Sequence, residues 1–395
     1  MTDRNLPTKI VVIGGGYAGT MAANRLRLGD DVGITLVNPR PKFVERIRLH
    51  QLVAGTHDAT VDYGGLLGED INLVVDTATR IDTANRTVEL ATHPALDYDY
   101  LIYAVGSTGA VPASVPGAAE FAYPIAELEQ AQRLRTAIDD LHPDAPVTVV
   151  GAGLTGIEAA TELAEQGRSV TLVGGGQLAP YLSERGRRSV AKVLRKLGIE
   201  VLEAAVVTEV RPSAVVFADG SVRDSAVTMW VAGFGVPDLA FASGLRTDTV
   251  GRLLTDETLT SVDDHRIVAA GDCASPSGVP LRMSCQMAGP LGMRAADTVL
   301  SRVAGTPPAV IDQASFGACI SLGRRSGIVQ LAHKDDRTVN LSFTGRFVAP
   351  IKEAVCKSTL WSLRREARKP GSAFWFKGGS RPEQRAFDPV AVMDR

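Results

Sequence analysis

Hydrophobic residues recur in two blocks of the chain. Each block has a continuous apolar run, then a glycine turn with a helical apolar period, and then a second apolar run. Residues 9–38 begin with the run KIVVI, pass through a glycine turn into an apolar-periodic stretch, and end with ITLVN. Residues 147–174 repeat this order as VTVV, GAGLTGIEAATELAEQG and VTLVG. β-branched runs are typical of buried strands, whereas an apolar period near 3.6 is typical of helices. Gly29 and Gly167 are expected to end the two helices. Each block therefore predicts a strand, a helix and a second strand.

Shorter strand-like runs follow each block. INLVVDTATRID, RTVELATH and YDYLIYAVG follow the first, and GIEVLEAAVVTEV, AVVFADG and AVTMWVAGF follow the second. Further strand patterns near 319–331 and 338–343 precede a basic stretch. The repetition predicts an α/β fold with two Rossmann-type nucleotide-binding domains, each a three-layer ββα unit, and a smaller α+β carboxy-terminal region.

Each block carries a glycine turn directly after its first strand. The spacing G-x-G-x-x-G occurs at Gly14, Gly16 and Gly19, and again at Gly151, Gly153 and Gly156. The first glycine permits the tight bend, the second lets a pyrophosphate approach the backbone, and the third lets helix and strand pack closely. One match occurs in many α/β proteins, but two in the same context indicate two dinucleotide sites.

The second strands end without the carboxylate that commonly holds a ribose 2′-hydroxyl. The first block has Asn38 at this position, which can still hydrogen-bond a hydroxyl. The second has Gly174, which begins a run of three glycines and carries no charge to repel a 2′-phosphate. Such a phosphate could be reached by Arg185, Arg187 or Arg188. The sequence leaves the choice between NADH and NADPH open.

Composition narrows the class of protein. At 395 residues, with 45% hydrophobic and 22% charged residues, the chain is expected to form two to three globular domains. A formal net charge of -2 gives no general attraction to nucleic acid. The amino terminus has no secretory pattern, and the four cysteines form no CxxC pair. We therefore expect free thiols, no metal site and a cytoplasmic location.

Four separated motifs within about residues 9–325 resemble the FAD/NAD-linked pyridine nucleotide reductases. The first glycine turn is similar to their FAD site and the second to their NAD(P)H site. YDYLIYAVGS (98–107) looks like their strand and loop near the flavin, and HRIVAAGDCA (265–274) like their flavin-closing motif. The resemblance implies an FAD-binding domain of residues 1–112 and 251–318, an NAD(P)H-binding domain of 113–250, and an interface or membrane-association region of 319–395.

The same resemblance implies the cofactor-binding residues. Those expected at FAD are Gly14, Gly16, Tyr17, Ala18, Gly19, Asn38, Arg46, Ala78, Gly106, Ser107, Gly271, Asp272, Met287 and Ala288. Those expected at NAD(P)H are Gly151, Gly153, Leu154, Thr155, Gly156, Gly174, Ala232 and Gly233. Asp272 is expected to bond the ribityl chain and the flavin phosphate region.

Within this group the chain is most similar to type II NADH dehydrogenases and apoptosis-inducing-factor-like quinone reductases. Glu158 matches their glutamate near the contact between nicotinamide and flavin. In CQMAGPLGM, Gln286 and Ala288 match the A-Q-x-A-x-Q pattern of the type II enzymes, but Pro290 replaces its second glutamine and weakens the respiratory interpretation. Residues 38–55 contain no cysteine, as disulfide reductases would need, and the cysteines of sulfide:quinone reductases are missing before residue 273.

The stretch FVERIRLHQ (43–51) clusters charged and polar residues after the first block. By the resemblance this loop approaches the flavin, where His50 and Gln51 are weak candidates for donating a proton to a reduced acceptor. The alternative is a solvated helix face with His50 paired locally. Both interpretations stay open.

The segment from Arg346 to Lys369 has seven Lys/Arg and two Glu. A helix from about 350 to 368 would place Cys356, Leu360, Leu363 and Ala367 on one stripe. Such a basic, tryptophan-bearing segment can lie on an anionic membrane. It can equally pack on its own domain or on a second subunit, as in a homodimer.

The function predicted from these features is hydride transfer from NADH or NADPH to FAD, followed by two-electron reduction of a quinone or similar acceptor. One alternative is a soluble biosynthetic or ferredoxin-linked flavin reductase. Another is an NAD(P)H-sensing flavoprotein interaction module. Catalytic candidates are Glu158, His50 and Gln51.

Overall fold

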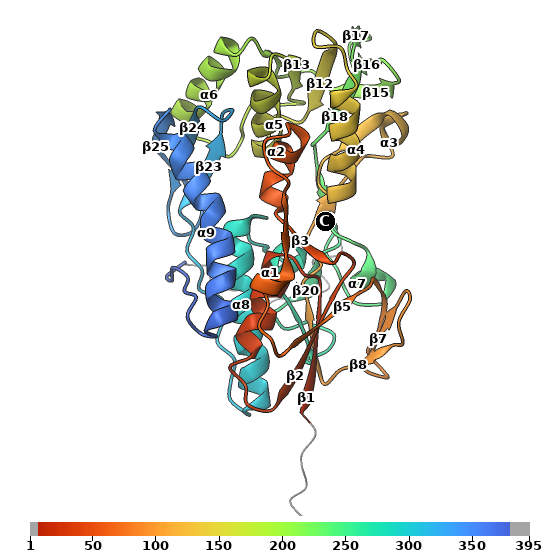
Figure 1. Cartoon of the computed structure of the whole chain (residues 1–395), viewed down its shortest axis with the longest axis vertical. Coiled ribbons are helices and arrows are strands. Elements are labelled where there is room, and N and C mark those ends of the chain that lie inside the picture. Colours follow the sequence, from red (N-terminus) through yellow and green to blue (C-terminus); the bar gives the residue numbers. More distant parts are fainter. Residues whose placement is uncertain (1–6, 380–395) are drawn as a thin grey trace, which may run out of the picture.

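The computed structural model describes residues 7–379, which form two lobes with a carboxy-terminal layer along their side (Figure 1). Each lobe contains a five-stranded parallel sheet flanked by helices and a small antiparallel sheet. The predicted α/β fold with two nucleotide-binding units of similar design is confirmed.

The lower lobe in Figure 1 has the strand order β21-β9-β1-β2-β5. Its strands are β1 (Thr8–Ile13), β2 (Val32–Asn38), β5 (Ile71–Val75), β9 (Tyr100–Tyr103) and β21 (Ile267–Ala269), with helices α1 (Tyr17–Leu26) and α8 (Cys285–Val303). The antiparallel sheet is β6 (Ala78–Asp82), β7 (Thr87–Leu90) and β8 (Leu96–Asp97). Helix α1 packs along α8, and the apolar run of β1 is buried, as in a sheet covered on both faces.

The upper lobe has the strand order β11-β18-β12-β13-β14. Its strands are β11 (Ala122–Pro124), β12 (Pro146–Val150), β13 (Ser169–Val173), β14 (Glu200–Leu202) and β18 (Val227–Trp230), with helices α4 (Leu128–Asp139), α5 (Leu154–Glu165) and α6 (Glu184–Lys196). The antiparallel sheet is β15 (Val207–Arg211), β16 (Ala214–Phe217) and β17 (Val222–Asp224). The order of elements matches that of the lower lobe.

Short elements connect these units. They are β3 (Lys42–Val44) paired with β4 (Thr60–Asp62), η1 (Arg46–Arg48), α2 (Leu49–Val53), η2 (Tyr63–Gly65), β10 (Thr108–Gly109) paired with β19 (Phe234–Gly235), α3 (Ala118–Phe121), α7 (Leu239–Ala242), β20 (Leu253–Thr255) paired with β22 (Ala274–Pro276), and η3 (Gly271–Cys273). Helix α2 belongs to the first half of the chain, yet Leu49 and Val53 pack in the core of the upper lobe. The domain boundaries given above stay a prediction.

The carboxy-terminal layer links the lobes. Its antiparallel sheet consists of β23 (Gly317–Ser321), β24 (Gly327–Ala332) and β25 (Thr338–Gly345), followed by helix α9 (Val348–Arg368). The sheet packs against α5 and α6 of the upper lobe, whereas α9 packs against α1 of the lower lobe (Figure 1). The predicted strands and helix of this region are therefore confirmed.

The apolar stripe of α9 faces inward. Cys356, Leu360, Leu363 and Ala367 are each less than 9% exposed, and Leu360 and Leu363 belong to the core of the lower lobe. The stripe therefore packs on the chain's own domain, whereas contact of the segment with a membrane or a second subunit stays a prediction. Within residues 7–379 we find no helix long and apolar enough to cross a membrane.

Candidate functional site

The two glycine turns have the same geometry. Gly14 and Gly151 have φ of +102° and +119°, where residues with a Cβ are strained. A Cβ on Gly19 would overlap the carbonyl oxygen of Gly14, and a Cβ on Gly156 would overlap that of Gly151. Glycine is therefore required at all four positions for the helix to pack this closely on its strand.

The middle glycines have room beside them. Gly16 and Gly153 are the N-caps of α1 and α5, and nothing lies within 4 Å of where a Cβ would be. The first turn of each helix offers backbone N–H groups without intrahelical acceptors, at Tyr17 and Ala18 in α1 and at Leu154 and Thr155 in α5. Both turns thus fit a pyrophosphate at a helix N-terminus.

Asn38, at the end of β2, holds the first turn in place. Its Oδ1 accepts a hydrogen bond from the N–H of Gly15 at 2.9 Å, and its Nδ2 donates to the carbonyl of Arg40 at 2.7 Å. The Tyr63 hydroxyl donates to the Gly15 carbonyl at 2.6 Å. Ala78 begins β6 two residues after Asp76, whose N–H donates to the Asn38 carbonyl at 3.0 Å. Contact of Asn38 with a ribose stays a prediction, and both atoms of its amide already have a partner.

Three predicted FAD residues from distant segments form one chain of hydrogen bonds. The Arg46 Nη1 donates to the Ser107 Oγ at 3.1 Å, and that hydroxyl donates to the Asp272 Oδ2 at 2.7 Å. Gly106 and Gly271, with φ of +74° and +80°, turn the backbone directly before Ser107 and Asp272. The chain places a cation, a hydroxyl and a carboxylate together, which fits the polar ribityl and phosphate part of a flavin nucleotide.

Helix α8 begins beside η3, which carries Asp272. Ser284 caps α8 by accepting the N–H of Met287 at 3.3 Å, and Met287 and Ala288 are buried in its first turn. Tyr17 packs edge-to-face on Phe43, with ring centroids 5.0 Å apart, and burial raises the pKa of the Tyr17 hydroxyl. Pro290 is the sixth residue of α8, beyond the first four N–H groups that lack intrahelical acceptors, so it removes the hydrogen bond that the Gln286 carbonyl would accept.

At the second site, the backbone of Glu203, the residue after the neighbouring strand β14, lies beside Gly174. A Cβ on Gly174 would overlap the backbone oxygen of Glu203, which follows β14, and the Glu203 Oε1 accepts the N–H of Leu178 at 2.9 Å. Of the arginines considered for a 2′-phosphate, Arg187 donates to the Leu182 carbonyl and Arg188 pairs with Glu184. The Glu203 carboxylate is therefore held at an N–H four residues after Gly174, and contact of either residue with a ribose stays a prediction.

The lobes meet through the loops that follow β9 and β18. Strands β10 and β19 pair antiparallel, with Thr108 opposite Gly235. Ser107 directly precedes this pair on one side, and Ala232 and Gly233 precede it on the other. Residues predicted for the flavin and for the nicotinamide are therefore brought to adjacent loops.

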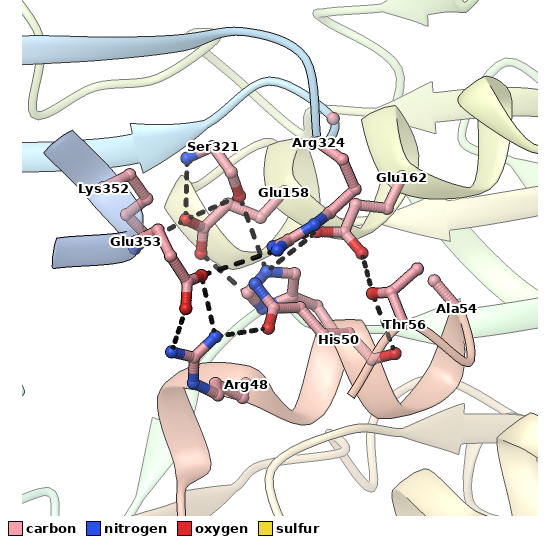
Figure 2. Close-up of polar contacts among 12 residues, drawn as sticks. Arg48, His50, Ala54, Thr56, Glu158, Glu162, Ser321, Arg324, Lys352 and Glu353 are labelled. Carbon is pink, nitrogen blue, oxygen red and sulfur yellow. Dashed lines mark hydrogen bonds and ion pairs between the residues drawn. The ribbon is translucent and has the colours of Figure 1, made fainter. Parts of the chain in front are cut away.

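A buried ionic cluster joins α2, α5, β23 and α9 (Figure 2). The Lys352 Nζ lies 2.9 Å from the Glu158 Oε1, which also accepts the backbone N–H and the hydroxyl of Ser321 at 3.0 and 3.2 Å. The His50 ring lies between two carboxylates, with Nδ1 3.9 Å from Glu158 and Nε2 3.6 Å from Glu162. Both carboxylates come from one face of α5, since they are four residues apart.

The pKa values of the groups in this cluster are shifted in different directions. Burial would raise the pKa of Glu158, but Lys352, His50 and the Ser321 N–H outweigh it and lower the pKa. Burial raises the pKa of Glu162 to about 7, despite a hydrogen bond from Thr56. Burial lowers the pKa of His50 to about 4, and the positive charges of Lys352 and Arg324 add to this effect. These shifts favour a neutral imidazole at His50 near neutral pH and bring the pKa of Glu162 close to neutrality.

The structure removes one interpretation of residues 43–51. His50, Gln51 and Arg48 are at most 3% exposed, so the alternative of a solvated helix face is wrong. The Gln51 Oε1 accepts a hydrogen bond from the Arg48 Nη1 at 2.8 Å. Arg48 also binds Glu353 of α9 through both of its terminal nitrogens. His50 and Glu158 come together, whereas the Gln51 side chain is held by Arg48.

The described cysteines are free thiols. Burial raises the pKa of Cys285 and of Cys319 to about 11, and that of Cys273 to about 12. Thiolates are the reactive form of cysteine, so these raised pKa values disfavour the reactive form near neutral pH. Among residues 7–379 no group of three His, Cys, Asp or Glu side chains could hold a metal ion.

A profile of the pyridine nucleotide-disulphide oxidoreductases matches residues 8–292 and includes both glycine turns and the Asp272 loop. The chain belongs to the pyridine nucleotide-disulphide oxidoreductase family. It is an oxidoreductase that uses FAD and NAD(P)H, as the sequence resemblance predicted.

Relatives within this family match most of the chain. An NADH dehydrogenase-like protein of Mycobacterium tuberculosis is 29% identical over 383 residues, covering 87% of this chain and 95% of the relative. One from Bacillus subtilis is 29% identical over 71% of this chain and 79% of its own length. A type II NADH:quinone oxidoreductase of Staphylococcus haemolyticus is 24% identical over 88% of this chain and 94% of its length.

Solved structures in this family share the fold. The sulfide:quinone oxidoreductase of Aquifex aeolicus has a TM-score of 0.78 and 21% identity, covering 92% of this chain and 93% of that one. NDH2 of Plasmodium falciparum in complex with NADH has a TM-score of 0.73 and 16% identity, covering 91% and 97%. These likenesses establish the fold alone.

Sequence reasoning missed several residues of the site. They are Glu162, Ser321, Arg324, Lys352 and Glu203. Glu162 was recognisable, since it follows Glu158 by one helical turn. The other four reach the site through tertiary packing of separate segments, for which the sequence has no local pattern.

Proposed function

We propose that this oxidoreductase passes two electrons from NAD(P)H through FAD to a quinone. The observation that carries this proposal is the buried cluster around Glu158, His50 and Glu162, two of whose members titrate near or below neutrality. Quinone reduction consumes protons as well as electrons, whereas an iron–sulfur partner such as ferredoxin takes up electrons alone. A buried proton-exchanging cluster supports the first kind of acceptor.

FAD, when bound, supplies the two-electron chemistry that no side chain provides. The glycine turns bind and orient the two dinucleotides, and the paired loops at β10 and β19 bring their ends together. Ser107 and Arg46 orient the Asp272 carboxylate. The thiols, protonated at neutral pH, support a route that needs no cysteine.

A steady-state panel of acceptors tests this function. The purified holoenzyme is given NADH or NADPH with a ubiquinone analogue, a menaquinone analogue, ferredoxin or ferricyanide. Quinone turnover at rates typical of enzymes, about 1–10³ s⁻¹, is expected. Fast flavin bleaching without quinone turnover would favour a ferredoxin-linked or biosynthetic reductase, and a long-lived charge-transfer complex would favour a sensing module.

We propose NADH as the preferred donor because of Glu203. Its backbone lies beside Gly174, where the ribose of the second dinucleotide is expected, and its carboxylate is held at the N–H of Leu178. A negative charge in this region would repel a 2′-phosphate. Titration of the holoenzyme with both nucleotides should give a lower Kd for NADH. In Glu203→Gln that ratio should fall about tenfold, equivalent to ~1.4 kcal/mol. An unchanged ratio would contradict the role of Glu203.

We also propose peripheral contact of 346–369 with an anionic membrane through its outward face. Phe347, Ile351, Val355 and Trp361 are 40–59% exposed there. Beyond Trp361, a pocket is lined by Arg364, Arg365, Arg368 and Lys369, which have no acidic partner among residues 7–379. Interleaved aromatic and basic side chains suit the headgroup region of a bilayer.

Vesicle sedimentation tests the membrane contact. The holoenzyme should sediment with phosphatidylglycerol vesicles and not with phosphatidylcholine vesicles. Arg364→Gln/Arg368→Gln should lose this binding, whereas the control Lys192→Gln/Lys196→Gln on the exposed face of α6 should keep it. Equal binding by both variants would contradict the proposal. Deleting 346–395 is unsuitable, because α9 supplies core residues.

A further inference from the structure

Reduction of a quinone has a proton requirement that NAD(P)H does not meet alone. The overall reaction is NAD(P)H + H⁺ + quinone giving NAD(P)⁺ + quinol. The hydride brings two electrons and one of the two protons of the quinol. The second proton comes from water, and a site closed to water must deliver it through the protein.

Glu162 has the surroundings of a carboxyl that holds a proton. It is 2% exposed, and its Oε2 accepts one hydrogen bond, from the Thr56 hydroxyl at 3.0 Å. Its Oε1 is buried and has no hydrogen-bond partner. A buried carboxylate oxygen without a donor is costly, whereas a protonated carboxyl needs no second donor. Glu158, one turn away, is instead satisfied by Lys352 and Ser321.

Charged groups face Glu162 from every element packed on it. Glu158 and Glu165 share α5 with it, His50 faces it from α2, and Arg324 lies 3.7 Å from its Oε1 in the turn after β23. Arg324 is partly shared with Glu353, whose Oε2 lies 3.5 Å from its Nη2 and which also binds Arg48. No cation is therefore dedicated to Glu162, which favours its neutral form.

The cluster has an opening to solvent on the side of α9. A cavity of about 240 Å³ lies between the turn after β23 and the start of α9. Its lining includes Ser321, Arg324, Lys352 and Glu353. Arg324 is 41% exposed at its side chain while it reaches Glu162. Water in this cavity stands one side chain away from the buried carboxyls.

We propose that Glu162 stores the second proton of acceptor reduction and that His50 passes it, by way of the Glu158–Lys352 pair, to an oxygen of the reduced quinone. Water entering the cavity at Arg324 then returns a proton to Glu162. This inference rests on the proposed quinone function. His50 can act because its two ring nitrogens face the two carboxylates, so one accepts a proton as the other releases one. The gaps of 3.6 and 3.9 Å exceed a hydrogen bond, and small side-chain movements close them.

A spectroscopic test addresses the stored proton directly. Infrared difference spectra of the holoenzyme across pH 5–9 should contain the C=O band of a protonated carboxyl that disappears near pH 7. Glu162→Gln should lack this band, whereas the control Glu165→Gln, in the same helix and less buried, should keep it. A band that persists in Glu162→Gln would overturn the assignment, whatever the electron acceptor is.

A kinetic test addresses the use of that proton. The reoxidation of pre-reduced holoenzyme is followed with a quinone and with ferricyanide, which takes electrons and no proton. In Glu162→Gln the quinone rate should fall about 10- to 100-fold and lose its pH dependence near 7, while the ferricyanide rate stays unchanged. Equal loss with both acceptors, or no loss with quinone, would overturn the proposal. A wild-type enzyme that reduces ferricyanide and no quinone would instead refute the proposed function.

Discussion

The buried pair Lys352–Glu158 gives a quantitative test of how the carboxy-terminal helix is held. At 2.9 Å, Coulomb attraction between the two charges is about 6 kcal/mol at an effective dielectric of 20. Desolvation offsets much of this, so the net value of the pair is small. Lys352→Met, however, leaves a carboxylate buried without its cation. We expect it to lower the free energy of unfolding by about 3–5 kcal/mol at pH 8.

The sign of the pH dependence follows from Glu158. Its pKa is lowered in the folded protein, so its contribution is present above the unfolded value of 4.5 and is lost as pH falls through the folded pKa. Without Lys352, burial raises that pKa instead, so Glu158 takes up a proton in mild acid. The deficit of Lys352→Met should therefore be smaller at pH 5 than at pH 8.

Denaturant unfolding of the holoenzyme measures both effects. Glu158→Gln/Lys352→Met should recover most of the stability lost in Lys352→Met, because no unpaired charge remains. The control Lys357→Met removes a lysine of the same helix that is 74% exposed and pairs with Glu353 at 3.7 Å, and it should cost ~0.5 kcal/mol or less. A deficit below 1 kcal/mol for Lys352→Met at pH 8, or no recovery in the double variant, would refute the reasoning.

Three further substitutions separate the parts of the molecule. In Gly156→Val the new side chain would collide with the Gly151 carbonyl, so NAD(P)H binding should be lost in a fluorescence titration while the flavin stays bound. Loss of the flavin as well would contradict the assignment of the first turn to FAD and the second to NAD(P)H. Ser107→Ala removes the hydroxyl between Arg46 and Asp272, and the Kd for FAD in equilibrium dialysis should rise about tenfold, or ~1.4 kcal/mol; an unchanged Kd would speak against that chain. Leu363→Ala should cost about 2–4 kcal/mol of unfolding free energy, because the side chain is 1% exposed, and a value near zero would contradict the burial of the α9 stripe.

The fold was predictable because its decisive patterns are local. A β-branched strand, a glycine turn and an amphipathic helix lie within about thirty residues, and Gly14 and Gly151 adopt the conformation that this spacing requires. The limits of α9 were also close to those predicted, since its apolar period is regular. The surface that its apolar stripe contacts was not predictable, because an apolar stripe can pack equally on a protein core and on a membrane.

The site was predictable only where a motif extends over consecutive residues. Asp272 and Ser107 lie in short motifs, and the structure brings them into one hydrogen-bond chain. Lys352 reaches Glu158 from about two hundred residues away, and Glu203, which follows a neighbouring strand, brings a carboxylate to the N–H of Leu178. Contacts between residues so far apart in the chain depend on tertiary packing, and a single sequence contains no periodic pattern that predicts them.

Helix α9 has a mechanical consequence for electron transfer. It is packed on α1 in one lobe, while Lys352 and Glu353 near its start hold Glu158 and Arg48 beneath the other (Figures 1 and 2). The helix thus contacts both lobes, and its contacts resist a change in their relative position. Hydride transfer requires the two reacting atoms to be held close together, so a helix that fixes one lobe against the other contributes to that alignment without touching either nucleotide turn.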